Sequence, residues 1–419
     1  MTTAAHTPAL YVALELGQDK WHLAFATQAA EKPRFRAIPA RDLGRLADEI
    51  HKAKGRFRLP ADAPVRTCYE AGRDGFWVHR ALAARGIDNV VVDSSSIEVD
   101  RRRKRVKSDP VDAAKLLTLL CRYHAGEAKV WRVVRVPAVA DEDRRQLHRS
   151  LKDLQRQQTE CSNRIQGLLA SYGLTAAVNA RFRDTLAELR DWAGEPVPAG
   201  LQRRLLQEFA VWEAVHAQVC QAGNEQERRL RTGTEPHLDQ VRRLMGLKAV
   251  GVRTAWVLVA ELFAWRGIRN GRELGALVGL TPMPYQSGQT DREQGISKAG
   301  NKHVRGLIVE AAWLWLRWQP GSDLSRWYAR RFGAGGRRAR KVGIVALARK
   351  LLVALWRYAD RGEVPAGGGR EGLAGAGELE APAAGEGGGR AGRGVSGGPG
   401  RAKAPAEGEV GGGRWYAAG

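Results

Sequence analysis

Cysteine is scarce in this sequence, and apolar runs are short. The four cysteines are far apart, with no CxxC pair: Cys68, Cys121, Cys161 and Cys220. This pattern indicates neither a disulfide framework nor a zinc site. No apolar run approaches 18 residues, which excludes a membrane-spanning helix. The amino end has neither a basic start nor a small-residue cleavage site, so we expect a cytoplasmic protein with reduced thiols.

Acidic residues are also few relative to basic ones. Lys and Arg number 68 against 45 Asp and Glu, which leaves a net charge of +23. Residues 366–419 contribute none of this excess, because their six basic and six acidic residues cancel. A compact body with such a charge repels itself unless it meets a polyanion. We therefore expect nucleic acid to be the partner of this protein.

Residues 8–132 alternate between short apolar runs and helical spacing. We expect strands at 10–16, 22–27, 65–69 and 89–93, and helices at 41–54, 75–85 and 110–123. The turn-like sequence between the first two runs indicates a hairpin. Strands that alternate with helices are typical of an α/β domain.

Residues 133–240 change to long amphipathic helix. One apolar stripe passes through Leu147, Leu151, Leu154, Cys161, Ile165 and Leu168. A second passes through Leu201, Leu205, Phe209, Trp212, Val215 and Val219. Two such helices predict either an antiparallel hairpin or a dimerising coiled coil. A helical spacer that packs on its own protein is the third interpretation.

Residues 241–362 form a third unit, mostly helical, with a polar loop at 281–300 and a basic helix at 337–361. Its tryptophans include Trp313, Trp315, Trp318 and Trp327. Their helical spacing favours core packing for most of them, although such rings also stack on bases. Residues 363–419 are rich in Gly, Ala and Pro, and we expect a disordered tail because they cannot bury enough surface to fold.

The α/β domain offers acidic residues on separate elements. They are Glu15 on the first strand, Glu70 at the end of the third, and Asp109 and Asp112 at a helix start. Phosphodiester chemistry on magnesium needs several carboxylates brought together in this way. The two aspartates share a helix face. The competing interpretation is that Asp109 caps the helix and Asp112 complements its dipole.

A polar loop supplies a serine among basic residues. Ser287 precedes Gly288, which would let a phosphate approach closely. The cations that could neutralise that phosphate are Arg292, Lys298, Lys302 and Arg305. An ordinary turn is the competing interpretation of a Ser-Gly pair in a loop.

Six of the seven residues at 101–107 are cations, directly before Asp109: Arg101, Arg102, Arg103, Lys104, Arg105 and Lys107. A charge run is usually a solvated face, but this one adjoins the proposed metal site. We expect it to contact the nucleic-acid backbone. The run at 337–341 is a second candidate for such contact.

Several motifs, taken in order, resemble one family. YVALEL, CYEAGRDGF and KSDPVDAAKL resemble the amino-terminal motifs of the DEDD transposases of bacterial insertion sequences, the IS one-ten class. The resemblance continues through GLKAVGVRTAWVLVAEL, LGALVGLTPMPYQSGQTDREQGISKAGNKHVRGLIVEAAW and ARKVGIVALARKLLVALWR. Together these motifs cover residues 9–362 in the family's order.

This resemblance implies a RuvC-like amino-terminal domain with an RNase H fold, a coiled-coil-like region and a helical transposase domain. The acids that bind Mg²⁺ or Mn²⁺ would be Glu15, Glu70, Asp109 and Asp112. Ser287 matches the serine that attacks DNA and holds it as a phosphoserine, and Ser297 is the second choice. The family's first acid is usually Asp, and Glu15 is one methylene longer.

Residues 247–254 resemble the hairpin of a helix-hairpin-helix, in which glycines let backbone N–H groups meet phosphate. Ala249 stands where the first glycine is expected, and Gly251 remains. We therefore expect this turn to serve helix packing rather than phosphate binding.

The function that the resemblance implies is that of a DNA transposase or site-specific recombinase, guided by an RNA transcribed from its element and associated with the nucleoid. Because the acids and the serine lie in different domains, we expect a dimer or tetramer with a site composed across subunits. Two alternatives stay open. One is a RuvC-like nuclease that hydrolyses branched DNA by metal-bound water. The other is a non-catalytic nucleic-acid-binding protein that lost its chemistry through Glu15.

Overall fold

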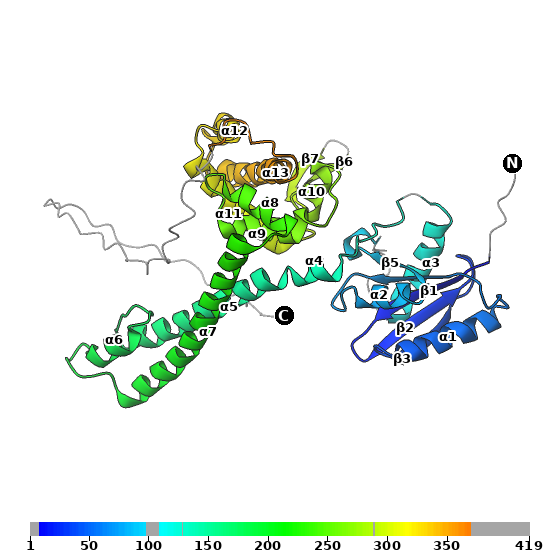
Figure 1. The fold of residues 1–419 in the computed structure, drawn as a ribbon, viewed down its shortest axis with the longest axis horizontal. Helices are drawn as coiled ribbons and strands as arrows, with labels where there is room; N and C mark the ends of the chain where they lie inside the picture. Colours follow the sequence, from blue (N-terminus) through cyan, green and yellow to red (C-terminus); the bar gives the residue numbers. More distant parts are fainter. Residues whose placement is uncertain (1–7, 98–108, 128, 288–289, 370–419) are drawn as a thin grey trace, which may run out of the picture. The chain divides into compact units, whose positions relative to one another are not determined.

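The computed structural model describes residues 8–97, 109–127, 129–287 and 290–369 (Figure 1). Its first part is a five-stranded mixed sheet with the order β3-β2-β1-β4-β5. The strands are β1 (Leu10–Leu16), β2 (Lys20–Ala26), β3 (Arg34–Pro39), β4 (Val65–Glu70) and β5 (Asp88–Val92). β1, β2 and β3 pair antiparallel, whereas β4 is parallel to both β1 and β5. The predicted α/β character is confirmed.

Helices cover both faces of this sheet. They are α1 (Leu43–Arg56), α2 (Trp77–Ala83), α3 (Asp109–His124) and the short η1 (Ser94–Ser96). Alternate residues of β1 point to opposite faces. Tyr11 and Ala13 pack in the cluster that α3 closes, while Leu10, Val12 and Leu14 pack in the cluster formed with α1 and α2. This alternation decides on which side of the sheet the next residue of β1, Glu15, projects.

The strands and helices expected in this domain are present, with ends that differ by a few residues. The sequence pattern missed β3, because five of its six residues are exposed and strand alternation is weak there. β3 is held as an edge strand by its antiparallel pairing with β2. Pairing with a neighbour, which local pattern does not report, therefore defines this element.

A pair of long helices follows the sheet domain. The helices of this region are α4 (Val139–Asp143), α5 (Gln146–Ala170), α6 (Phe182–Glu188) and α7 (Ala199–Thr232). Hydrogen bonds join Arg164 to Glu208, Trp212 to Ser162 and Gln158 to His216. The residue number in α5 falls as its partner's number in α7 rises, so the two helices are antiparallel. Of the three interpretations of this region, the structure shows a hairpin within one chain (Figure 1).

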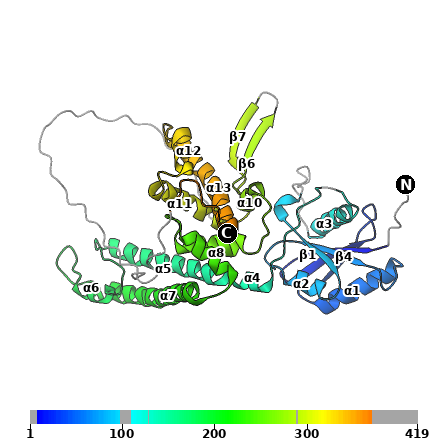
Figure 2. The same ribbon diagram turned by 45° about the horizontal axis from the view of Figure 1, so that its top comes forward.

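The third part is a helical domain with one two-stranded ribbon. Its elements are α8 (Pro236–Met245), α9 (Val252–Leu258), the π-helical turn η3 (Val259–Phe263), α10 (Gly271–Leu277), β6 (Pro282–Ser287), β7 (Thr290–Ile296), α11 (Lys302–Trp318), α12 (Asp323–Phe332) and α13 (Arg337–Arg361). Their apolar faces form one core, in which Trp315 is fully buried. Trp313 and Trp318, on the same helix, are about half exposed (49% and 56%), so core packing does not account for them. The ribbon of β6 and β7 extends away from the helices (Figure 2).

The chain past α13 returns to the helical domain. Gln319 donates to the Gly369 carbonyl at 2.9 Å and accepts from the Gly369 N–H at 2.7 Å, and Asp323 N–H donates to the Ala366 carbonyl at 3.0 Å. The sequence predicts a disordered tail at 363–419. The structure describes 363–369 of it, and hydrogen bonds attach part of this segment to the helical domain. Residues 370–419 lie outside the described residues.

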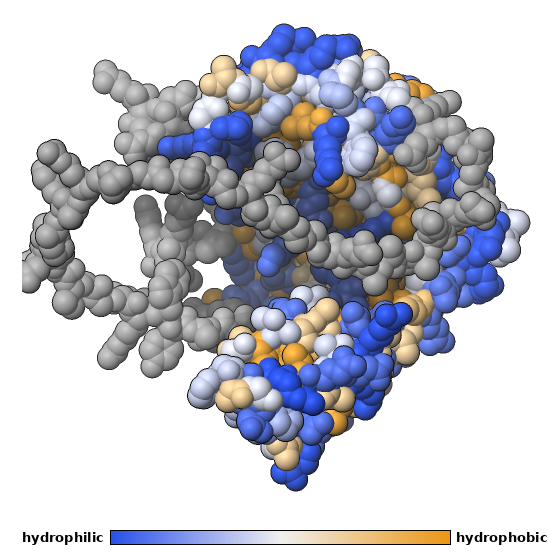
Figure 3. All heavy atoms as spheres, turned by 90° about the vertical axis from the view of Figure 1, so that its left-hand side faces the viewer, coloured by the Kyte–Doolittle hydropathy of each residue, from blue (hydrophilic) through white to orange (hydrophobic). Residues whose placement is uncertain are grey.

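The distribution of hydrophobic residues indicates whether a surface or a helix could enter a membrane. On the face drawn in Figure 3, hydrophobic residues form separate patches among hydrophilic ones. No helix in the described part of the chain combines the length and the apolar character needed to cross a bilayer.

Candidate active site

Two acids lie at the carboxyl edge of neighbouring parallel strands. The parallel register pairs Leu14 of β1 with Tyr69 of β4, so Glu15 and Glu70 are the next residues on each strand. Glu15 is half-buried and Glu70 is exposed. Ligands of open α/β sheets bind at this edge, outside the carboxyl ends of the strands. The sheet therefore brings together two acids that are 55 residues apart in the sequence.

The start of α3 adds a third acid. Glu15 continues the side of β1 that faces α3, and Asp112 lines the same cleft as Glu15 and Glu70. Asp109, one turn earlier, has its carboxylate 3.4 Å from His22 Nε2, on the strand next to β1. Asp109 and Asp112 therefore lie in different environments. Asp112 lines the cleft that also contains Glu15 and Glu70, which we call the acidic cleft, whereas Asp109 lies against His22.

The acidic cleft has a volume of about 390 Å³ and is lined entirely by residues between 15 and 112. Its walls are the loops that follow β1 and β4. Arg73 joins these loops by donating to Gln18 Oε1 at 3.1 Å. Asp74, which sequence reasoning missed, also lines the cleft and lies 3.7 Å from Arg73 and 3.8 Å from Arg41. Asp74 stands in the same motif as Glu70, CYEAGRDGF, and this position in the sequence could have indicated it.

The donor set suits a hard divalent cation, because Mg²⁺ and Mn²⁺ prefer carboxylate oxygens. Among the residues that the structure describes, no three His, Cys, Asp or Glu side chains are grouped closely enough to hold a metal ion. The acids therefore share one cleft without being closed around an ion. Side-chain movements of Glu15, Glu70 and Asp112 would be needed to complete such a site.

Ser287 is the last residue of β6, where the ribbon reaches its turn. Its register partner is Thr290 of β7. Tyr285, two residues before Ser287 on β6, is paired with Arg292 of β7. The serine is thus presented at the end of a two-stranded ribbon. Ser297 lies at the other end of that ribbon, where its N–H donates to the Thr281 carbonyl at 2.9 Å and its hydroxyl is buried.

The base of the ribbon is fastened to α10 by close backbone approaches. Gly279 (φ +70°) and Gly300 (φ +92°) are both left-handed, and a Cβ on either would lie within 2.3 Å of a carbonyl oxygen across the loop. Arg305 donates to the carbonyls of Val278 and Lys298, both at 2.9 Å. Of the cations predicted to neutralise phosphate, Arg305 is therefore engaged by this loop, whereas Lys298 and Lys302 are exposed.

A buried carboxylate ties this base to the long helices. Glu261, in the π-helical turn η3, is 2% exposed. It accepts two hydrogen bonds from Arg149 (2.8 and 3.0 Å), one from His148 Nε2 (3.0 Å) and one from Asn301 (3.2 Å). Asn301 also caps α11 by accepting from the His303 and Val304 N–H groups. One carboxylate therefore links α5, η3 and the loop that follows the ribbon of β6 and β7, which we call the serine ribbon because it carries Ser287.

The charge of Glu261 is maintained by these partners. Burial alone would raise the pKa of its carboxyl, but the hydrogen bonds from His148 and Arg149 outweigh burial and lower the pKa to about 2. Burial, with help from Lys152 and His148, lowers the pKa of the neighbouring His303 to about 4. Sequence reasoning missed Glu261, although an acid inside the apolar run WVLVAELF was a signal of the kind used for Glu15.

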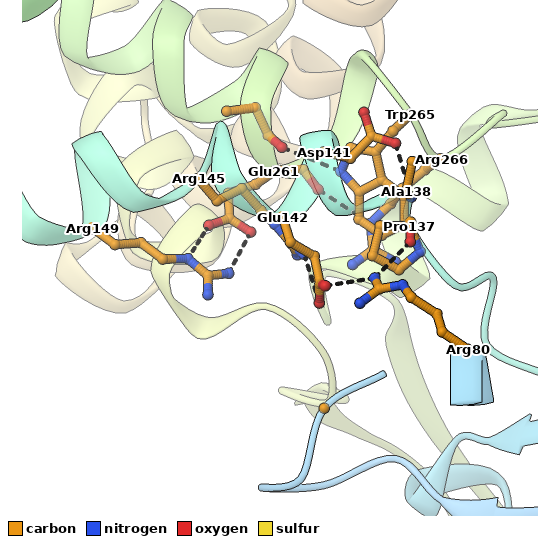
Figure 4. Close-up of polar contacts among 12 residues, drawn as sticks. Arg80, Pro137, Ala138, Asp141, Glu142, Arg145, Arg149, Glu261, Trp265 and Arg266 are labelled. Atoms are coloured by element: carbon orange, nitrogen blue, oxygen red, sulfur yellow. Dashed lines mark hydrogen bonds and ion pairs between the residues drawn. The ribbon is translucent and has the colours of Figure 1, made fainter. Parts of the chain in front are cut away.

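Further ion pairs surround this network (Figure 4). Arg80 of α2 contacts Glu142 of α4 at 2.5 Å and donates to the Pro137 carbonyl at 2.9 Å. Arg145 lies 3.7 Å from Glu142 and over the ring of Trp265, 5.1 Å from its centroid. The segment that leaves the sheet domain is thus held by charged side chains at its start and at its entry into α5.

Two remaining sequence predictions concern nucleic-acid contact. The turn between α8 and α9 places Ala249 in the left-handed region (φ +76°), the conformation that the missing glycine would adopt more easily. The basic run at 101–107 lies outside the described residues.

Similarity to known proteins agrees with the motif order. Residues 241–326 match the family described as Transposase IS116/IS110/IS902. A putative transposase of Sinorhizobium fredii is 38% identical over 369 residues, which is 85% of this chain and 93% of the relative. A probable family 20 transposase of Pseudomonas aeruginosa is 29% identical over 55% of this chain and 67% of its own length. The transposase for insertion sequence element IS1328 of Yersinia enterocolitica is 28% identical over 52% of this chain and 63% of its own.

Proposed function

Because the chain belongs to the IS116/IS110/IS902 family of transposases, we propose that it cleaves and rejoins DNA with the acids of the acidic cleft and with Ser287. One observation carries the proposal: Glu15, Glu70 and Asp112, from three separate elements, line a single cleft. A carboxyl edge that collects acids from two strands and a helix start supports the RuvC-like assignment with an RNase H fold. The competing interpretation, in which Asp112 only complements the dipole of α3, does not require this convergence.

The acids would hold Mg²⁺ or Mn²⁺, with Asp109 as a further ligand if it leaves His22. The ion would act as a Lewis acid on a phosphate oxygen. The protein's own contribution is to keep carboxylates at one edge of a rigid sheet. Arg73, bonded to Gln18, holds the two loops of the cleft together. Glu15 fits this role despite its extra methylene, because it lies next to the end of β1 and borders an open cleft rather than a packed core.

Ser287 would supply the nucleophile. Its hydroxyl loses a proton, its oxygen bonds to phosphorus, and one P–O bond of the strand breaks, with the proton passing to the released strand end. Attack on the phosphoserine by another strand end reverses these steps and restores the serine. The terminal place of Ser287 on the ribbon supports this role, whereas the buried hydroxyl of Ser297 makes that residue the poorer choice.

The partners belong to the same proposal. The net charge of +23 supports binding of DNA and of an RNA that guides target choice. Every lining residue of the acidic cleft comes from the sheet domain, so Ser287 would reach the metal from another surface or from another subunit. A homo-oligomer with composite sites satisfies this requirement.

A metal-dependent nuclease is the second candidate. It is favoured by the observation that no residue of the helical domain lines the acidic cleft. In that case metal-bound water would hydrolyse the strand, and no covalent protein–DNA species would form.

Trapping of the covalent intermediate separates the two functions. The full chain is mixed with DNA carrying the element's ends, the element's RNA and Mg²⁺, and is then denatured. We expect the wild type to retain DNA covalently, and Ser287→Ala to lose the adduct while folding and DNA affinity stay within about twofold, since the change removes a single hydroxyl.

Ser297→Ala is the matched control and should keep the adduct. Adduct formation by Ser287→Ala, or its loss only in Ser297→Ala, would overturn the nucleophile assignment. Strand cleavage without any adduct in the wild type would favour the nuclease.

A further inference from the structure

The helical domain contains a second cleft, which the proposed chemistry does not use. It has a volume of about 1090 Å³ and lies between α10, α12, α13 and the inner ends of β6 and β7. Its apolar surface includes Leu280, Leu324, Trp327, Phe332 and Val342. We call it the ribbon cleft, because Pro282 and Ile296, at the base of the serine ribbon, form part of its wall.

One face of α13 is turned to the ribbon cleft rather than to the core. The core stripe of this helix includes Leu347, Leu351 and Leu355, all fully buried. The stripe at 342, 346, 349, 353 and 357 has helical spacing too, yet it lines the cleft. Val342 on this stripe is 50% exposed. The sequence therefore keeps a second amphipathic face on α13, which α10 and α12 cover only in part.

The charge of the ribbon cleft has one sign. Its cations are Arg272, Arg331, Arg349, Lys350 and Arg357, and no Asp or Glu is among its lining residues. Within the described part of the chain, none of these five cations is in an ion pair with an acid. Several cations without a neighbouring acid, in a concave and partly apolar surface, focus a positive potential. The ligand that complements this cleft is an anion.

The apolar floor narrows the choice of anion. Trp327 is half-buried and has Lys350 Nζ at 4.7 Å from its ring centroid, while Arg331 lies 5.9 Å from the ring of Phe332. Free phosphate would need the cations but not the rings. A paired duplex keeps its bases stacked inside and turns only phosphates outward. Unpaired nucleotides combine phosphates with exposed base faces, and aromatic rings beside cations are the surfaces on which they stack.

We propose that the ribbon cleft binds an unpaired nucleic-acid segment, with phosphates on Arg331, Arg349 and Lys350 and a base against Trp327. A pocket of this size suits one or a few bases, since pockets for drug-sized ligands measure about 300–1,000 Å³. β6 runs from Pro282 in the cleft wall to Ser287, a rise of roughly 17 Å at the usual spacing of a strand. A strand seated in the cleft would therefore reach the proposed nucleophile by continuing along the ribbon over this distance. The binding itself does not depend on Ser287 being that nucleophile.

The test measures binding without chemistry. The full chain carrying Ser287→Ala is titrated, without divalent ions, into labelled single-stranded oligonucleotides and a duplex of the same sequence, and anisotropy is recorded at several salt concentrations. Lys350→Gln and Arg331→Gln should each weaken single-strand binding about three- to tenfold and reduce the salt slope by roughly 0.7 per lost phosphate contact. Trp327→Leu should weaken it about tenfold, by loss of stacking.

Arg330→Gln is the matched control, since Arg330 is the exposed neighbour of Arg331 on α12 but does not line the cleft. It should leave the single-strand affinity unchanged. Thermal unfolding of each variant checks the fold, and Lys350→Gln, on an exposed position, keeps the test valid if Trp327→Leu unfolds.

Three results would overturn the inference. Equal losses for duplex and single strand would reduce the cleft to a phosphate patch. Unchanged affinity in both Lys350→Gln and Arg331→Gln would show that nucleic acid binds elsewhere. Unchanged affinity in the cation variants, combined with tighter binding after removal of residues 370–419, would assign the cleft to the chain's own carboxyl end. None of these results depends on adduct formation, so failure here is distinguishable from failure of the proposed function.

Discussion

Each proposed metal ligand has a different local environment, and this decides how much its removal should matter. Asp112 lines the acidic cleft with Glu15 and Glu70, while Asp109 is placed against His22. Both aspartates stand in the first turn of α3, where an acid also favours the helix dipole. Stability alone cannot therefore separate a ligand from a dipole partner, whereas metal affinity can.

Asp112→Asn should weaken Mn²⁺ binding about tenfold or more, because it removes a charged ligand from the cleft. Asp109→Asn should weaken it less, since that carboxylate lies nearer to His22. Mn²⁺ affinity is read by electron paramagnetic resonance on the full chain, independently of DNA cleavage. Equal, small effects from the two changes, with unfolding shifted by about 1 kcal/mol, would favour the capping interpretation.

At the scale of elements, the serine ribbon depends on a charge that lies outside it. Glu261 of η3 joins Arg149 of α5 to Asn301, which caps the start of α11. A π-helical turn is rare and frequently marks a functional site. Here the turn places a carboxylate where helix α5 and the ribbon's loop both reach it. Loss of this carboxylate should affect how the ribbon is held as well as how stable the domain is.

Glu261→Gln should destabilise the full chain by roughly 3 kcal/mol, because it breaks a buried ion pair and leaves His148 and Arg149 without their anion. The free energy of unfolding in urea measures this loss. Glu225→Gln is the matched control, since Glu225 pairs with Arg228 and Arg229 on an exposed face of α7 and should change stability little. Similar losses in both variants would show that burial does not govern the pair at Glu261.

The start of α11 also predicts a pH dependence. The pKa of His303 is about 4 in the folded chain and ordinarily about 6.5. Between these values the unfolded chain binds more protons, so stability is full above pH 6.5 and falls as pH drops toward 4. Glu261, with its pKa near 2, adds a loss of the same sign below pH 4.5.

His303→Asn should therefore flatten the decline in unfolding free energy between pH 6.5 and 4. Because His79, His124 and His237 also have lowered pKa values, the informative quantity is the difference between wild type and variant across this range. A parallel decline in both proteins would contradict the role given to His303.

At the scale of the whole molecule, the end of the folded body lies beyond α13. Gln319 is 4% exposed and uses both ends of its amide on Gly369. Pro365 is buried in the same segment. Residues 363–369 thus complete the helical domain, although their composition resembles that of the chain that follows.

Truncation after Gly362 should lower the melting temperature by several degrees, because about three hydrogen bonds are lost and the amide oxygen of the buried Gln319 loses its partner, while its amide NH2 group keeps the Lys248 carbonyl; the cost is roughly 2 to 4 kcal/mol. Truncation after Gly369 preserves those bonds and serves as the comparison. Equal melting temperatures for the two shortened chains would show that the segment adds nothing to the fold.

The sequence by itself determined the alternation of strand and helix, the two long amphipathic helices and the motif order that identifies the family. These features are local: periodicity of two or 3.6 residues and the spacing of acids are written in neighbouring positions. It also singled out Glu15, Glu70, Asp109 and Asp112, because these acids stand on separate elements of one domain.

Only the tertiary structure decided which of these residues meet, because the partners come from distant parts of the chain. The parallel pairing of β1 with β4 brings Glu15 beside Glu70. The charge of Glu261 depends on Arg149, 112 residues earlier, and on Asn301, 40 residues later. The ribbon cleft likewise exists because α13 has one face in the core and another against α10 and α12. Helical spacing reveals both faces of α13, but only packing decides which of them is covered.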